Sequence, residues 1–131
     1  MRLPFILATI LSFLLYSPQV LAQTSNITVK AGATTVIYGR YSFDANTCGA
    51  MIAPKAKVRS AGSGKVTIKR QRTRLKSGRC AGRTVLGTAI TYRPKAGFRG
   101  KDKVVIGFSG PRYTDGSGYS YHKQTFNITV R

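Results

Sequence analysis

The sequence has no glutamate and no tryptophan, and its only acidic side chains are Asp44, Asp102 and Asp115. His122 is its only histidine. Acid–base catalysis by a carboxylate pair, or a calcium site, needs acids that are more numerous and closer together. No Gly-x-Ser-x-Gly elbow accompanies Asp115 and His122, so the usual serine-hydrolase pattern is also missing. We therefore predict a protein that is not an enzyme and that uses no metal or other cofactor.

Long apolar runs are missing after residue 22. Before that point Arg2 precedes an apolar stretch over residues 3–16, and Val20 and Ala22 fit the small-residue positions of a signal-peptidase site. A membrane anchor is the alternative, but this stretch is shorter than the roughly 20 residues that span a bilayer. We predict a signal peptide over residues 1–22, one mature domain over residues 23–131 without a transmembrane segment, and a periplasmic or secreted location.

Positive charge is what the sequence has in excess. Lysine and arginine number 22 against three aspartates, and without Arg2 the mature chain would carry 21 − 3 = +18. A chain with this charge attracts polyanions in general. Its hydrophobic content of 42% and its 14 glycines favour a compact β domain over a disordered basic tail.

The two cysteines, Cys48 and Cys80, are an even pair in a chain predicted to be exported. Thiols outside the cytosol are usually oxidised and paired. A metal or redox site would need more ligands or a Cys-x-x-Cys spacing, and the sequence has neither. We predict one disulfide, which closes a loop of 80 − 48 = 32 positions and stabilises the fold by about 3–4 kcal/mol in the chain-entropy model.

Hydrophobic residues recur with a period of two along the mature chain, which indicates strands. Pro54 suits an edge strand or the entry to a strand, and residues 60–64 (SAGSG) are a turn. No helical window and no internal repeat is evident, so we predict a single antiparallel β-sandwich. About seven strands are expected, around Ile27 and Val29 and over residues 35–43, 51–58, 65–71, 83–92, 101–108 and 119–130.

The segment from Tyr92 to Val104, YRPKAGFRGKDKV, resembles the Tyr-x-Pro-x-x-Gly-Phe-x-Gly-x-Asp-x-Phe segment of bacterial immunoglobulin-like and cadherin-like extracellular domains. It departs from that pattern at Val104, where an aromatic residue is usual, and in its charge. The resemblance implies an immunoglobulin-like sandwich from a bacterium, with a noncatalytic binding or structural role at the cell surface or envelope. The local chemistry agrees: Pro94 fixes φ, glycines permit positive φ, Asp102 suits backbone amides, and Phe98 would plug the loop.

The strongest chemical signal is the acid-free stretch over residues 65–83. A strand continued past Ile68 would place Arg70, Arg72 and Arg74 on the core face, where an unpaired charge is very unfavourable. We therefore expect the strand to end, bulge or twist outward near Arg70, and the rest to form a basic loop tied down at Cys80. Arginine binds phosphate, sulfate or carboxylate through two parallel hydrogen bonds, and the alternative is a solvated loop that only aids solubility. The predicted polyanion-binding residues are Lys65, Lys69, Arg70, Arg72, Arg74, Lys76, Arg79 and Arg83.

A second candidate is the segment over residues 109–122, which is rich in Gly, Ser and Tyr. Such loops make adaptable recognition surfaces, and a recognition loop would use Arg112, Tyr113, Tyr119 and Tyr121. We favour the alternative of a plain hairpin, because Asp115-Gly116 and Ser117-Gly118 are turn dipeptides. The sequons at Asn26 and Asn127 are interpreted as strand residues.

The predicted function is an exported, noncatalytic module that binds an anionic envelope or host polymer, namely lipopolysaccharide, an acidic glycan or nucleic acid. Such binding should weaken steeply with salt. The alternative is a structural or protein-interaction subunit of the bacterial envelope or surface, with the charge as background. A membrane-active basic protein is a third class, but the sequence has no separate amphipathic cationic helix.

Overall fold

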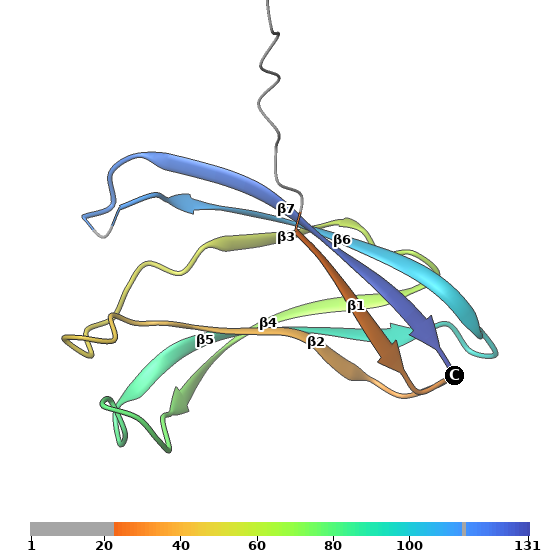
Figure 1. Ribbon diagram of the computed structural model, residues 1–131, viewed down its shortest axis with the longest axis horizontal. Coiled ribbons are helices and arrows are strands. Elements are labelled where there is room, and N and C mark those ends of the chain that lie inside the picture. Colours follow the sequence, from red (N-terminus) through yellow and green to blue (C-terminus); the bar gives the residue numbers. More distant parts are fainter. Residues whose placement is uncertain (1–22, 114) are drawn as a thin grey trace, which may run out of the picture.

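The computed structural model describes residues 23–113 and 115–131, and the predicted signal peptide at residues 1–22 lies outside these (Figure 1). No helix of these residues has the length and hydropathy of a membrane span. The predicted all-β fold with seven strands is confirmed. The strands are β1 (Gln23–Val29), β2 (Thr35–Ser42), β3 (Lys55–Ser60), β4 (Gly64–Arg74), β5 (Thr84–Pro94), β6 (Gly100–Pro111) and β7 (Tyr119–Val130).

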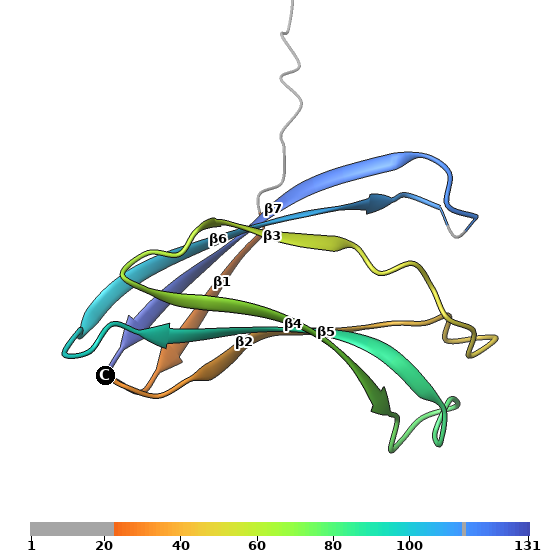
Figure 2. The same ribbon diagram turned by 180° about the vertical axis from the view of Figure 1, so that it is seen from behind.

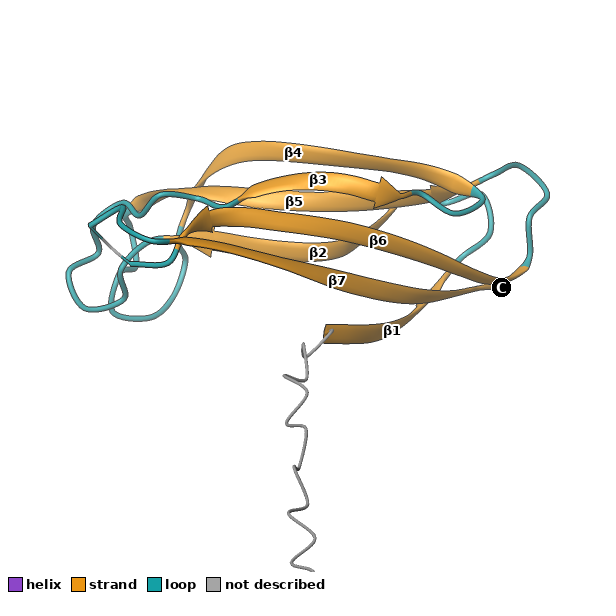
Figure 3. Ribbon diagram, turned by 90° about the horizontal axis from the view of Figure 1, so that it is seen from above, coloured by secondary structure: helices purple, strands orange, loops and turns teal. Residues whose placement is uncertain are grey.

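The strands form two sheets, one in the order β1-β7-β6-β3 and the other in the order β2-β5-β4. Seen from above, β4 lies at one long edge of the molecule and β1 at the other (Figure 3). The expectation of a wholly antiparallel sandwich is wrong in one place, because β1 pairs with β7 in parallel. The short connection over residues 30–34 carries the chain from β1 into the other sheet. β1 therefore cannot form a hairpin with β2, and it lies instead against the last strand.

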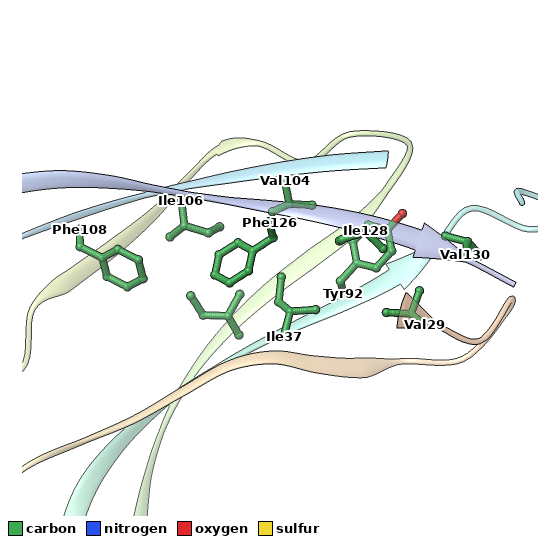
Figure 4. Close-up of a cluster of buried hydrophobic side chains, with 10 residues drawn as sticks. Val29, Ile37, Tyr92, Val104, Ile106, Phe108, Phe126, Ile128 and Val130 are labelled. Carbon is green, nitrogen blue, oxygen red and sulfur yellow. The ribbon is translucent and has the colours of Figure 1, made fainter. Parts of the chain in front are cut away.

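The hydrophobic core lies between the two sheets and follows the predicted period of two (Figure 4). Tyr92, Val104 and Ile106 are fully buried, and Phe126 and Ile128 are nearly so. Burying one such aliphatic or aromatic side chain contributes about 1.5–3 kcal/mol. Both sheets therefore depend on this layer, whose buried members are Val29, Ile37, Ile90, Tyr92, Val104, Ile106, Phe108, Phe126, Ile128 and Val130.

The segment over residues 92–104 forms the end of β5, a turn and the start of β6. Gly97 and Gly100 have φ angles of +76° and +111°, which favour glycine at both positions. Asp102 accepts hydrogen bonds from the backbone N–H of Ser63 at 2.9 Å and from the hydroxyl of Tyr92 at 2.5 Å. Phe98 is half-buried and packs against the core. The expected use of Asp102 for backbone amides is confirmed.

Three connections gather at one end of the molecule, over residues 43–54, over residues 75–83, and over residues 112–118 apart from 114 (Figures 1 and 2). The predicted disulfide is confirmed: it joins Cys48 in the first of these connections to Cys80 in the second, with Cα atoms 5.5 Å apart. The first connection follows β2 and the second follows β4, and these strands belong to the same sheet. The disulfide therefore fixes the shape of this end. We call it the disulfide end.

A candidate anion-binding surface

The strand β4 carries most of the predicted basic site, and it does not end where expected. Its register with β5 runs without a shift from Gly64, opposite Pro94, to Arg74, opposite Thr84. The strand therefore neither ends nor bulges near Arg70, and of the three expected outcomes only an outward twist is left. Arg70, Arg72 and Arg74 belong to a regular strand and lie on the same face of it as Ile68.

These three arginines avoid the core because of where β4 lies. It is the edge strand of its sheet, and the two layers diverge toward the disulfide end (Figures 1 and 2). The guanidinium of Arg70 donates a 3.0 Å hydrogen bond to the carbonyl of Pro54, immediately before β3 begins. Arg70, Arg72 and Arg74 are all exposed. Because the charges stay in water, the large penalty of burying them does not arise.

The other predicted residues follow the same edge but lie on different faces. Lys65 and Lys69 alternate with the arginines and lie on the outer face of β4. Three more cations, Lys76, Arg79 and Arg83, lie in or at the end of the connection after β4, next to Cys80. Arg74 holds this connection by donating a 3.1 Å hydrogen bond from Nε to the carbonyl of Gly82. All eight predicted residues are exposed, and together they form the site that we call the β4 surface.

Arg40 is a further exposed cation that the sequence analysis did not include. Arg40 of β2 and Arg70 of β4 both lie opposite Thr88 of β5, so they flank it in one cross-strand row. Neighbouring strands are about 4.8 Å apart, so the two backbones lie about 10 Å from each other. Along β4 the arginines repeat every two residues, or about 6.7 Å. Only the strand register places Arg40 beside the others, because it is 30 positions from Arg70 (70 − 40).

The acidic side chains do not neutralise this surface. Asp44 accepts hydrogen bonds from the backbone N–H of Asn46 and Thr47, and these lower its pKa. Asp115 likewise accepts from Ser117, which lowers the pKa of Asp115. The hydrogen bonds to the three aspartates come from backbone N–H groups and from the Tyr92 hydroxyl, and none comes from a lysine or arginine side chain. The positive charge of the β4 surface therefore remains available to a ligand.

A depression of about 330 Å³ adjoins the β4 surface at Arg72. Cys48 and Met51 line it together with Thr84 and Leu86 of β5. Its lining is mostly apolar apart from the arginine. The depression offers room for part of a ligand beside a guanidinium, and the disulfide holds its wall in place.

The segment over residues 109–122 forms the plain hairpin that we favoured, with Pro111 paired to Tyr119. Its tyrosines Tyr113, Tyr119 and Tyr121 are exposed, as is Arg112. The hydroxyl of Tyr121 accepts a 3.1 Å hydrogen bond from Nε of Arg59 on β3. These residues therefore belong to the other sheet and are not gathered into the β4 surface. Thr114 of this hairpin lies outside the described residues.

His122 stacks on Phe108, with ring centroids 5.2 Å apart, and Asp115 accepts a hydrogen bond from the backbone N–H of Ser117. Within residues 23–113 and 115–131, no group of three or more His, Cys, Asp or Glu side chains could hold a metal ion.

No protein-family model, no curated protein and no solved structure matches the chain. The indications of function accordingly come from the chemistry of the surface.

Proposed function

We propose that the protein is an exported, noncatalytic binding module that contacts an anionic polymer through the β4 surface. The observation that carries the proposal is the row of Arg70, Arg72 and Arg74, which a regular strand presents to solvent with no carboxylate partner among residues 23–113 and 115–131. Five more cations extend this row onto the outer face of β4 and the following connection. The polymer belongs to the class of lipopolysaccharide, acidic glycan or nucleic acid, all of which repeat phosphate, sulfate or carboxylate groups.

An immunoglobulin-like fold is part of this proposal. Its support is the strand order, since β2-β5-β4 and β7-β6-β3 correspond to the B-E-D and G-F-C arrangement of such sandwiches. Export is supported by the disulfide, because disulfides persist mainly outside the cytosol. Sandwich modules of this kind serve many functions, so the ligand is argued from the surface and not from the fold.

The chemistry of arginine favours this class of ligand. A guanidinium presents planar, paired donors that match phosphate, sulfate and carboxylate groups. Each exposed ion pair is weak by itself, at about 0.2–1 kcal/mol. Several pairs on one polymer add up, because their counterions are released together. Affinity should therefore come from the number of contacts and fall steeply with salt.

The test compares the protein with a variant in which Arg70, Arg72 and Arg74 are replaced by serine. Binding to lipopolysaccharide, heparin and DNA is measured over a salt series. For DNA, the slope of log K against log salt should fall in magnitude by about 2–3, since each lost phosphate contact removes about 0.7–0.9. The polymer with the highest affinity at physiological salt identifies the ligand class.

A matched control replaces three exposed cations at the opposite end of the molecule with serine, namely Lys30, Lys95 and Arg131. Both variants carry 18 − 3 = +15 on residues 23–131, so a general effect of net charge would weaken them equally. Equal losses, or binding of all three polymers that disappears at physiological salt, would contradict the proposal. The search would then turn to a protein partner, in line with a structural or protein-interaction role in the envelope.

A further inference from the structure

The outer face of the sheet β1-β7-β6-β3 carries a second group of cations that the sequence analysis did not single out. Six of them are exposed and come from three strands. Alternation along β3, β6 and β7 directs them away from the core, since Val104, Ile106 and Phe126 occupy the buried positions. The six are Lys55, Lys57, Arg59, Lys101, Lys103 and Lys123.

The strand register brings these residues into rows across the sheet. Lys57 and Lys123 both lie opposite Gly107, so they flank it in one row. The side chains of Arg59 and Tyr121 lie over Gly107. A Cβ added to this glycine would lie 3.0 Å from Nε of Arg59 and 2.9 Å from the hydroxyl oxygen of Tyr121. The missing side chain of Gly107 therefore lets the arginine and the tyrosine lie close against the sheet.

A second row places two uncharged amide side chains beside a lysine. Lys103 lies opposite Asn127, which lies opposite Asn26 of β1. Asn127 donates a 3.1 Å hydrogen bond from Nδ2 to Oδ1 of Asn26. This bond uses one group of each amide, so the pair still offers a carbonyl oxygen and an NH₂ group. Both asparagines are exposed.

A depression of about 610 Å³ lies along this second row. Asn26, Asn127 and Thr129 line it together with Lys101 and Lys103. Asp102 also borders it, but its carboxylate is held by Tyr92, Ser63 and its own neighbour Lys103 through the backbone N–H. The lining thus combines cations with amide and hydroxyl groups on an open sheet face.

We infer that this outer face is a second binding surface, and that its ligand is an acidic polysaccharide. Lysines would neutralise carboxylate or sulfate groups, while Asn26, Asn127 and Thr129 would bond sugar hydroxyls as both donors and acceptors. This composition differs from the β4 surface, where arginine predominates and the amide pair is missing. The inference goes beyond the proposed function, because it concerns the other sheet and adds a requirement for hydroxyl recognition.

The test uses three variants with equal net charge on residues 23–131. The outer-face variant has Lys57, Lys103 and Lys123 replaced by serine. The other two are the β4 triple variant and the control at Lys30, Lys95 and Arg131. A fourth variant, Asn127→Ala, keeps the charge and removes the amide pair. Probes are a heparin-derived octasaccharide, a neutral dextran oligosaccharide and a DNA oligonucleotide. Thermal melts establish that each variant is folded.

We expect the outer-face variant to bind the octasaccharide about tenfold more weakly than the control, since three exposed ion pairs are lost. Asn127→Ala should weaken octasaccharide binding and leave DNA binding unchanged. A surface that only aids solubility would not show this second effect. The dextran oligosaccharide should bind poorly to every protein, since it lacks acid groups.

Three results would overturn the inference. In the first, the outer-face variant binds the octasaccharide as tightly as the control variant does. In the second, the outer-face variant loses affinity for the octasaccharide and for DNA by the same factor. The third is an Asn127→Ala variant that matches the unmodified protein with every probe. Loss of binding in the β4 variant alone would leave the proposed function intact and remove only this second surface. Loss in the outer-face variant alone would remove the proposed β4 site and keep this one.

Discussion

The hydroxyl of Tyr92, at the buried end of β5, donates a 2.5 Å hydrogen bond to Oδ2 of Asp102, near the start of β6. The same carboxylate accepts the backbone N–H of Ser63, from the turn between β3 and β4. Tyr92 is fully buried. One aspartate therefore ties three segments together at the end of the molecule opposite the disulfide.

This contact predicts a loss of stability in alkali. Burial, and then the hydrogen bond and charge of Asp102, raise the pKa of Tyr92 above its ordinary value of 10. Its contribution to stability is fully present below pH 10 and is lost as the pH rises above that value, because only the unfolded chain then releases the proton. As the pH rises above 10, the free energy of unfolding of the unmodified protein should fall more steeply than that of the Tyr92→Phe variant. The difference in slope should be up to about 1.4 kcal/mol per pH unit. Urea denaturation between pH 8 and 11.5 measures both slopes, and equal slopes would contradict the prediction.

Loss of the disulfide should destabilise the domain strongly. The 32 positions between Cys48 and Cys80 correspond to about 3–4 kcal/mol in the chain-entropy model. Urea denaturation of the oxidised protein, the reduced protein and the double variant Cys48→Ser/Cys80→Ser gives this difference. Reductant should have no effect on the double variant. A loss below about 1 kcal/mol would show that the disulfide end holds its shape without the covalent link.

Two strand glycines should respond to alanine in opposite ways. A Cβ on Gly64 would lie 2.5 Å from the Tyr92 ring and 2.6 Å from the carbonyl of Arg93, and neither group can move freely. Gly64→Ala should therefore destabilise the fold by about 1–3 kcal/mol, as overpacking does. A Cβ on Gly39 would meet nothing within 4 Å, so Gly39→Ala should leave stability unchanged or raise it by up to about 1 kcal/mol. Thermal and urea unfolding compare the two, and similar effects would contradict the predicted close approach at Gly64.

The triple serine variant of the β4 surface should remain folded. Arg70, Arg72 and Arg74 are exposed on an edge strand. Arg70 and Arg74 each donate one hydrogen bond to a backbone carbonyl. Exposed substitutions of this kind change stability by about 0.5 kcal/mol each. We expect a total change below about 1.5 kcal/mol by urea denaturation. A larger loss would mean that these arginines support the fold, and single variants would then be needed for the binding test.

The sequence was sufficient to predict the strands and the disulfide, because both depend on local or countable signals. Period-two alternation locates β7 at Tyr119–Val130 without error, and an even cysteine count predicts the bond between Cys48 and Cys80. Pro54 was expected at an edge or a strand entry, and β3 begins at the next residue as an edge strand. The strands are decided by a few neighbouring residues, and the disulfide by the presence of only two cysteines.

The course of β4 could not be predicted in the same way. Alternation correctly places Arg70 on the face of Ile68, but it does not tell whether the opposite sheet covers that position. Whether the opposite sheet covers Arg70 depends on where β3 begins and on how far the two layers diverge. Both are set by residues elsewhere in the chain. The outer-face cations were missed for a related reason. The repeats Lys55-x-Lys57 and Lys101-x-Lys103 are visible in the sequence, but only the strand register brings them together with Lys123.

The parallel pairing of β1 with β7 also affects how the chain can fold. Gln23 lies opposite Gln124, a separation of 124 − 23 = 101 positions, and contacts this far apart form slowly because a long loop must close first. β1 cannot find its partner until nearly the whole chain is available. Residues 23–29 therefore lack their strand partner until β7 is available, whereas β4 and β5 are consecutive strands that pair across a short connection. Completion of the β1-β7-β6-β3 sheet is thus a late step, and it follows synthesis of the last strand.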